Sequence, residues 1–386
     1  MSNKRVYLDY AATTPLDAGV LQKMLSFFSE DFGNPSSVHS WGQRAEGAIE
    51  AARVKIANRL NASPSEIIFT SCGTESDNLA IRGVALAEQT SRGANHILTT
   101  PVEHHAVLHT VQQLERYFGF TVEFLPVDPF GMVDPLDVKA RITPQTALVS
   151  VIYANNEIGT INPVAEIGAI CHEAGIAFHT DAVQAAAHLK IDVQKEAIDL
   201  LTIGAHKFYG PKGVGALFVQ SDHRLIPSQT GGSQESGLRA GTQNVPYIVG
   251  MAEALEASQG NLADEAKKLL PLRARIISGV LANVPRAQLT GHPIQRLANH
   301  ASFVFEDVDG NRLLMLLDQN GFACSSGSAC KVGDPKPSEV LTSIGLSDNW
   351  ALGSLRVTLG KFTTQEEVDS FLAVLPSLVE KARRSA

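Results

Sequence analysis

The middle of the chain alternates short hydrophobic, β-rich runs with segments of helical periodicity. The β-rich runs cover residues 66–71, 95–100, 121–126, 146–153, 175–180, 199–204 and 213–219. Hydrophobic residues spaced by three and four predict a helix over 45–60. N-cap and first-turn residues predict another over 74–89, and Pro163 favours a helix start at 163–174. Such alternation is typical of an α/β domain with a mostly parallel sheet, where ligands bind beyond the carboxyl ends of the strands.

The pattern changes after a glycine-rich stretch at 230–244. A long helical segment follows, and Pro271 predicts a break within it. The last hundred or so residues contain strand-like runs at 301–308 and 354–360 and end in a helical pattern. This region is therefore predicted to form a second, smaller α/β domain.

Composition narrows the class of protein. The chain has 386 residues, 44% of them hydrophobic, enough for two or three globular domains. Its net charge of −8 argues against direct nucleic-acid binding, which more often goes with a basic excess. We find no apolar run long enough for a membrane helix and no signal-peptide core. The four cysteines form no CxxC pair, so we expect no structural metal and a reducing, cytoplasmic location.

Two residues with candidate chemistry follow β-rich runs. Lys207 lies just past the run 199–204, where partial desolvation would let a lysine form a Schiff base; the alternative is a solvated surface lysine. Lys212, nearby, is interpreted as a turn residue. Asp181 ends another run, and a buried carboxylate there needs a positive partner such as a protonated pyridine nitrogen. A helix N-cap is the alternative role for Asp181.

An anion site is a further candidate. Residues 71–78 place small and hydroxyl side chains, Thr74 among them, where a strand gives way to a helix. Free backbone N–H groups and the helix dipole favour an anion such as phosphate at that point. An ordinary helix cap explains the same residues.

Cysteine chemistry is the last candidate. Cys330 lies in the segment 325–338, which is poor in apolar residues and therefore suits a reachable thiol; Lys331 could help to lower its pKa. The alternative is an inert, buried cysteine. The other three cysteines are interpreted as packing residues: Cys72, Cys171 and Cys324.

Together these pieces resemble the cysteine desulfurases of the NifS/IscS type, within the class V aminotransferases of fold type I. Ten blocks carry the resemblance in order along essentially the whole chain: YLDYAATTP (7–15), FGNPSSVH (32–39), FTSCGTESDNLAI (69–81), VEHHAVL (102–108), ANNEIGT (154–160), FHTDAVQ (178–184), GAHKFYGPKGVGAL (204–217), GGSQESGLRAGTQN (231–244), SSGSAC (325–330) and LRVTLGKFTTQEE (355–367).

The resemblance implies a fold and a domain organisation. The fold would be that of a fold type I pyridoxal phosphate-dependent transferase, with a large, mostly parallel seven-stranded sheet domain and a smaller C-terminal α/β domain. Residues 1–14 would pack with the small domain, 15–258 would form the large cofactor-binding domain, and 259–386 would form the small domain with the cysteine-bearing loop.

The resemblance also implies how the cofactor is held. Lys207 would hold pyridoxal phosphate through a Schiff base, Asp181 would pair with the pyridine nitrogen, and His104 would stack on the ring and act in proton transfer. The remaining contacts would be Asn156 and Gln184 at the phenolic oxygen, Gly73, Thr74 and His206 at the phosphate, and Thr242 reaching the phosphate from the second subunit of a homodimer.

For the substrate, the resemblance implies that Arg356, helped by Asn34, clamps a carboxylate, since a guanidinium fork matches that group. L-cysteine would be converted to L-alanine, leaving a persulfide on Cys330. The sulfur would then pass to a protein acceptor, most simply a scaffold for iron–sulfur cluster assembly. A selenocysteine lyase, another class V aminotransferase and a non-catalytic homologue are the alternatives.

Some positions depart from the family pattern. Gly204 stands where a phosphate-binding serine is usual, so one hydroxyl donor is lost unless water replaces it. Ser233 and Cys72 each stand where glycine is usual. The residues after Cys330 change the charge of the loop, which bears on the sulfur acceptor more than on the chemistry.

Overall fold

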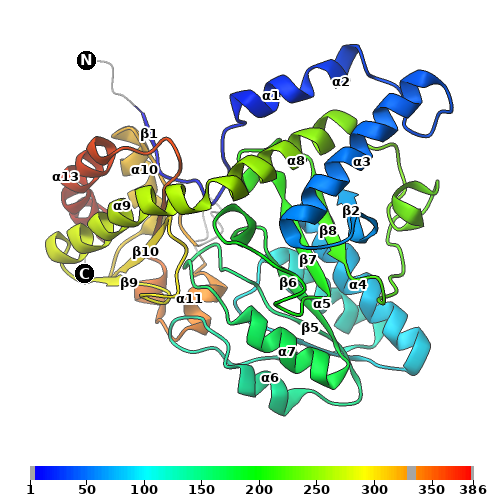
Figure 1. Ribbon diagram of the computed structural model, residues 1–386. Coiled ribbons are helices and arrows are strands. Elements are labelled where there is room, and N and C mark those ends of the chain that lie inside the picture. The colour runs from blue at the N-terminus through cyan, green and yellow to red at the C-terminus, as the bar shows by residue number, and fades with distance from the viewer. Residues whose placement is uncertain (1–4, 328–335, 384–386) are drawn as a thin grey trace.

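The computed structural model describes residues 5–327 and 336–383, which form a large and a small lobe (Figure 1). The helices are α1 (Ala18–Met24), α2 (Ser26–Ser29), α3 (Ser40–Leu60), α4 (Gly73–Arg92), α5 (His105–Phe118), α6 (Pro135–Arg141), α7 (Val164–Ala174), α8 (Val245–Gly260), α9 (Leu262–Asn283), α10 (Gly310–Gln319), α11 (Glu339–Ser343), α12 (Asp348–Ala351) and α13 (Gln365–Ala382). The strands are β1 (Val6–Tyr7), β2 (Ile67–Thr70), β3 (His96–Thr99), β4 (Thr121–Phe124), β5 (Thr146–Ser150), β6 (Ala177–Asp181), β7 (Leu200–Gly204), β8 (Gly215–Val219), β9 (Ala287–Leu289), β10 (His300–Phe305), β11 (Phe322–Ala323) and β12 (Ser354–Thr358).

The large lobe is built on a seven-stranded sheet in the order β2-β8-β7-β6-β5-β3-β4. Strand β8 is antiparallel to both of its neighbours, and the other pairs are parallel. Each of the seven predicted β-rich runs coincides with one of these strands, and only β6 extends past its run, by the single residue Asp181. The prediction of a mostly parallel α/β sheet is confirmed.

Both faces of this sheet are buried, which explains why its strands are almost continuously apolar. Successive residues of one strand enter different cores: Phe178 packs with α3, α7 and α8, whereas Ala177 packs with α4 and α5. In the next strand, Leu201 packs on the side of α3, α7 and α8, and Leu200 packs on the side of α4 and α5. The helices therefore lie on both sides of the sheet, as Figure 1 shows, and leave the carboxyl ends of the strands for the site.

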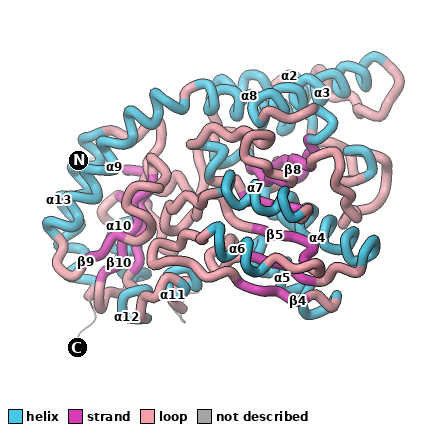
Figure 2. Tube along the Cα trace, turned by 60° about the horizontal axis from the view of Figure 1, so that its bottom comes forward, coloured by secondary structure: helices cyan, strands magenta, loops and turns pink. Residues whose placement is uncertain are grey.

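The small lobe has its own hydrophobic core. The antiparallel sheet β12-β10-β9 packs with α9, α10 and α13, which gather around it in Figure 2. Strand β1 pairs with β11, so the N-terminal segment contributes Val6 and Leu8 to this core. The predicted smaller C-terminal α/β unit is thus present.

The predicted break at Pro271 is wrong. Helix α9 runs through Pro271, and the chain breaks at Asn261, which ends α8 and caps the start of α9. The backbone of Asn261 is not helical (φ −119°, ψ 11°), and its side-chain amide donates to the carbonyl of Ala257. The long helical segment is therefore divided into two helices at Asn261, and the proline lies inside the second of them. Among the described residues, no helix has both the length and the apolar character needed to cross a bilayer.

Candidate active site

An inner cavity of about 260 Å³ lies beyond the carboxyl ends of the large sheet's strands. It brings together nine of the predicted residues: Gly73, Thr74, His104, Asn156, Asp181, Gln184, His206, Lys207 and Arg356. They come from the end of β6, from the segments after β2, β3, β5, β6 and β7, and from β12 of the small lobe. The sheet topology therefore collects residues that lie far apart in the sequence.

Lys207 stands in a short 3₁₀ turn immediately after β7. Its Nζ donates hydrogen bonds of 2.7 Å to the carbonyl oxygens of Ala11 and Ala12. Burial, followed by the positive charge of Arg356, lowers the pKa of Lys207 to about 8. A neutral, nucleophilic amine is therefore accessible close to neutral pH, as Schiff-base chemistry requires. Lys212 lies in an exposed turn, as predicted.

Asp181 is the last residue of β6 and is buried. Its carboxylate accepts a 2.9 Å hydrogen bond from the backbone N–H of Val183. Burial and the nearby Asp77 carboxylate raise the pKa of Asp181 to about 6, which His104 partly offsets. A cation placed against this carboxylate would relieve the cost of burying its charge.

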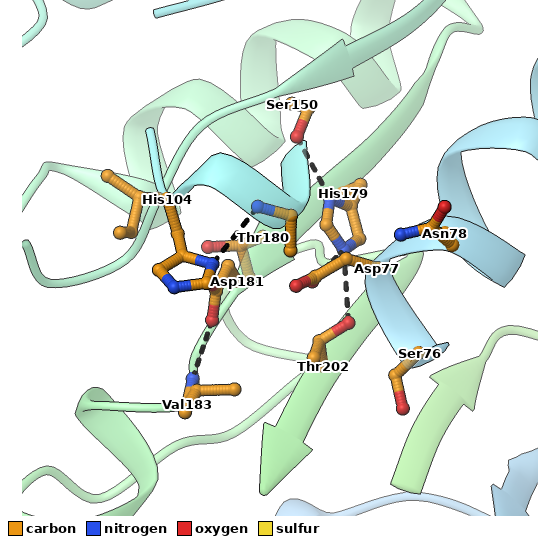
Figure 3. A network of polar contacts seen from close by, with 12 residues as sticks. Ser76, Asp77, Asn78, His104, Ser150, His179, Thr180, Asp181, Val183 and Thr202 are labelled. Atoms are coloured by element: carbon orange, nitrogen blue, oxygen red, sulfur yellow. Dashed lines mark hydrogen bonds and ion pairs between the residues drawn. The ribbon is translucent and has the colours of Figure 1, made fainter. Parts of the chain in front are cut away.

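His104 is the residue before α5 and lines the inner cavity beside Asp181 (Figure 3). Its Nδ1 accepts a 3.1 Å hydrogen bond from the backbone N–H of Ala106. Desolvation lowers the pKa of His104, which favours the neutral ring, and a neutral ring that accepts at Nδ1 carries its proton on Nε2. The hydrogen bond thereby fixes both the tautomer and the plane of the ring.

A buried polar network lies beside Asp181, as Figure 3 shows. The two nitrogens of His179 contact Ser150 (2.9 Å) and Thr202 (3.2 Å), and its Nε2 lies 3.5 Å from the Asp77 carboxylate. Burial lowers the pKa of His179 to about 4 and raises that of Asp77 to about 7. The sequence analysis missed this network, because a helix residue and a strand residue about a hundred positions apart gave no shared signal.

The start of α4 opens into the same cavity. Its N-cap, Cys72, makes no side-chain capping hydrogen bond, and Gly73 and Thr74 line the cavity directly. The N-terminus of this 20-residue helix therefore offers free backbone donors and a positive dipole end to an anion. Cys72 is half-buried and also lines the cavity, so its interpretation as a packing residue is wrong; Cys171 is fully buried and fits that role.

Two further predicted cofactor residues have partners of their own. The amide of Gln184 donates to the carbonyl of Ala11 (2.8 Å), and Nδ1 of His206 lies 3.2 Å from the Thr13 hydroxyl. Burial, followed by the charge of Lys207, lowers the pKa of His206 to about 4. A neutral His206 can donate a hydrogen bond into the cavity but brings no charge.

Arg356 joins the two lobes at the site. From β12 its guanidinium donates to the Asn156 carbonyl and forms an ion pair with Asp9, both at 3.0 Å. Its side chain is 9% exposed, and its Nε has no hydrogen-bond partner among the described residues. A buried guanidinium donor without a partner suits a substrate carboxylate. The role of Asp9 as the counter-ion was not apparent in the sequence.

An outer cavity of about 480 Å³ adjoins the inner one, since His104, Asn156 and Arg356 line both. Its wall includes Gly327 and Lys336, the described residues that flank the segment 328–335. Cys330 lies in that segment, outside the described residues. Cys324, by contrast, packs against the small-lobe core, as predicted, and burial raises the pKa of its thiol.

Two predicted residues lie elsewhere in the protomer. The side chain of Asn34 accepts from the backbone N–H of Ser36, and Asn34 lines neither the inner nor the outer cavity. Thr242 is exposed and lines neither cavity. Within one copy of the chain, neither residue joins the other site residues.

The donor set fits pyridoxal phosphate. One part of the inner cavity holds a buried carboxylate for a protonated ring nitrogen, Asp181, and another holds an uncapped helix N-terminus for a phosphate. Lys207 lines the same space with a lowered pKa. Fold and site together define a pyridoxal phosphate-dependent enzyme of fold type I.

Comparison with known proteins agrees with this class. The Aminotransferase class-V family matches residues 6–371, and the chain belongs to that family. A relative from Clostridium botulinum, "Cysteine desulfurase IscS", is 49% identical over 99% of this chain and 96% of its own length. A solved "NifS-like protein" is 38% identical with a TM-score of 0.91, over 98% of this chain and all of the other. A structure described as "SspA in complex with cysteine" is 36% identical, with a TM-score of 0.81 over 93% of this chain and 99% of the other.

Proposed function

We propose that this chain is a pyridoxal phosphate-dependent cysteine desulfurase, which converts L-cysteine to L-alanine and transfers the sulfur to a protein acceptor. One observation supports this activity over transamination. Arg356, the proposed carboxylate clamp, lines both the inner cavity and the outer cavity, whose wall includes the residues flanking the Cys330 segment. A transaminase has no need of a thiol there, whereas desulfuration needs a sulfur acceptor within reach of the bound amino acid.

The cofactor residues have distinct proposed roles. Bound pyridoxal phosphate supplies an electron sink for bonds at the α-carbon of the substrate. Lys207 holds the cofactor, Asp181 keeps the ring nitrogen protonated, and His104 stacks on the ring. Asn156 and Gln184 contact the phenolic oxygen, while Gly73, Thr74 and His206 contact the phosphate.

We assign removal of the α-proton to Lys207 rather than to His104. The Nδ1 lone pair of His104 is occupied by the Ala106 N–H, and its Nε2 carries the proton of the neutral ring. The amine of Lys207 has a pKa of about 8 and is therefore a competent base near neutral pH.

The substrate residues complete the proposal. Arg356, which lines both cavities, binds the carboxylate through its guanidinium group, and Asn34 stays a predicted contributor. The Cys330 thiolate forms a bond to the substrate sulfur as the bond from that sulfur to the β-carbon breaks. The product is a persulfide on Cys330, which then passes its terminal sulfur to the acceptor.

We further propose a homodimer in which Thr242 contacts the phosphate of the second subunit, and an acceptor that is a scaffold protein for iron–sulfur cluster assembly. The name IscS of the Clostridium botulinum relative supports this kind of acceptor. A cytoplasmic location suits the chemistry, since a thiol that cycles through a persulfide needs a reducing compartment.

The activity is tested by alanine release. Purified protein loaded with pyridoxal phosphate is incubated with L-cysteine and a thiol reductant, and alanine and sulfide are measured over time. We expect equimolar alanine and sulfide, because each sulfur removed leaves one alanine. Loss of L-cysteine that requires an added keto acid, and that yields the matching amino acid without sulfide, would favour an aminotransferase. A strong preference for selenocysteine would favour a lyase.

Gly204 gives a prediction for cofactor affinity. A Cβ built there would lie 3.6 Å from Val183 Cγ1 and 3.7 Å from the Gly73 nitrogen, which is ordinary contact. A serine therefore fits beside the proposed phosphate site. We expect Gly204→Ser to lower the Kd for pyridoxal phosphate at least about tenfold, the gain from one hydrogen bond to a charged group. Titration of the apoenzyme measures it, and Gly204→Ala controls for the added methyl; equal affinity of the two variants would show that the hydroxyl makes no phosphate contact.

A further inference from the structure

The loop before Thr242 has an unusual backbone. Glu235 (φ 47°, ψ 47°) and Ser236 (φ 56°, ψ 29°) both adopt left-handed conformations, and Gly237 follows with φ 80°. Two consecutive non-glycine residues in this region are disfavoured, because the Cβ crowds the following carbonyl oxygen. Such a conformation persists only where the surroundings hold it, and held strain is found chiefly at functional sites.

The side chain of Glu235 provides the restraint. It is 5% exposed and accepts hydrogen bonds from both terminal nitrogens of Arg53 (2.8 and 3.1 Å). Its carboxylate also accepts from the backbone N–H of Phe69 (2.9 Å) and from the Gln243 side chain (3.0 Å). Four donors satisfy this one carboxylate, and the Arg53–Glu235 ion pair ties the loop to α3 and β2.

The contacts of Glu235 lead directly to Thr242. Gln243, which shares the carboxylate, is the next residue in the chain. On the other side of Thr242, Arg239 pairs with Glu75 at 2.8 Å, next to the phosphate-site residue Thr74. Thr242 is therefore held between two anchored residues while its own side chain remains exposed.

We propose that Glu235, held by Arg53, is a positioning residue that presents Thr242 to the cofactor phosphate of a second copy of the chain. The inference rests on the proposed function, in which Thr242 contacts that phosphate. Thr242 does not line the inner cavity of its own protomer, so any phosphate that it contacts belongs to another copy. A buried ion pair suits this task because it fixes one geometry of the loop.

The test compares binding of pyridoxal phosphate with binding of pyridoxal, which has no phosphate. We expect Glu235→Gln and Thr242→Val each to weaken pyridoxal phosphate binding about tenfold, the loss of one hydrogen bond to a charged group, with little change for pyridoxal. The double variant is expected to lose no more than either single one, because both changes remove the same contact. Glu50→Gln is the matched control: Glu50 also pairs with Arg53 (3.0 Å), but its side chain is 57% exposed.

Mixed dimers separate positioning from general damage to the fold. In a dimer of a Glu235→Gln chain and a Lys207→Ala chain, the intact Lys207 site receives its Thr242 from the chain with the intact loop. The amount of cofactor that borohydride fixes at that site is measured at increasing concentrations of pyridoxal phosphate. The resulting Kd is expected to equal that of the wild-type protein. An affinity equal to that of the Glu235→Gln homodimer would overturn the inference.

The outcomes also separate this inference from the proposed function. If the Thr242→Val variant binds pyridoxal phosphate as the wild-type protein does, Thr242 does not contact the phosphate, and that part of the proposed function is wrong. Loss with Thr242→Val but none with Glu235→Gln would refute only the positioning role. If Glu235→Gln does not fold, Arg53→Lys carries the same expectation, since it keeps the charge and loses the bidentate fork.

Discussion

Replacing Lys207 with alanine is expected to abolish the cofactor's long-wavelength absorption band and to lower desulfuration at least about a hundredfold, the usual contribution of a general base. The variant loses both the amine that holds the cofactor and the proposed base for the α-proton. Nothing else in the inner cavity combines a nucleophilic amine with a lowered pKa, among the residues that the structure describes. The absorption spectrum, with and without borohydride reduction, measures the first effect, and alanine release measures the second.

The control for this experiment is Lys212→Ala. Lys212 lies only five positions further along the chain, in an exposed turn, and does not line the inner cavity. We expect that variant to keep the absorption band and wild-type turnover. A Lys207→Ala protein that stays yellow, with a linkage that borohydride reduces, would mean that another lysine holds the cofactor.

The large sheet could be predicted from the sequence because its strands are buried on both faces. Runs such as 199–204 are apolar at nearly every position, and the helices between them carry clear periodicity. The predicted starts at 74 and 163 lie within one residue of the starts of α4 and α7, whereas α3 begins at Ser40, several residues before its apolar face starts. A cap is set by local hydrogen bonds, here from the backbone N–H of Gly42 to Nδ1 of His39, which periodicity does not register.

The site residues also include some that the sequence could predict and some that it could not. Asp181 and Lys207 could be placed because one ends a strand of the sheet and the other follows one closely, and the carboxyl ends of parallel strands meet. Asp9 and Asp77 could not, because their roles come from partners in distant segments: Arg356 in one case and His179 in the other. Thr242 shows a further limit, since its proposed partner belongs to another copy of the chain.

Replacing Cys330 with serine is expected to lower alanine formation from L-cysteine at least about a hundredfold while leaving the cofactor spectrum unchanged. Serine preserves the size of the side chain but cannot accept sulfur as a thiolate can. The variant should therefore bind the cofactor and still give the spectral change caused by L-cysteine. Alanine release and mass spectrometry of the protein, which detects an added sulfur, measure the effect.

The matched control is Cys72→Ser, because the half-buried thiol of Cys72 lines the inner cavity. The proposed reaction needs a thiol at one defined position, and a thiol that is merely near the cofactor does not suffice. The Cys72→Ser variant should therefore still form the persulfide on Cys330 and keep its turnover. Cys171 and Cys324 are poor competitors, since burial raises the pKa of both and thiolates react far faster than thiols. Equal alanine from the native protein and the Cys330 variant would leave the cofactor assignments intact and remove Cys330 from the reaction. Loss in the Cys72 variant instead would place the sulfur acceptor beside the phosphate site.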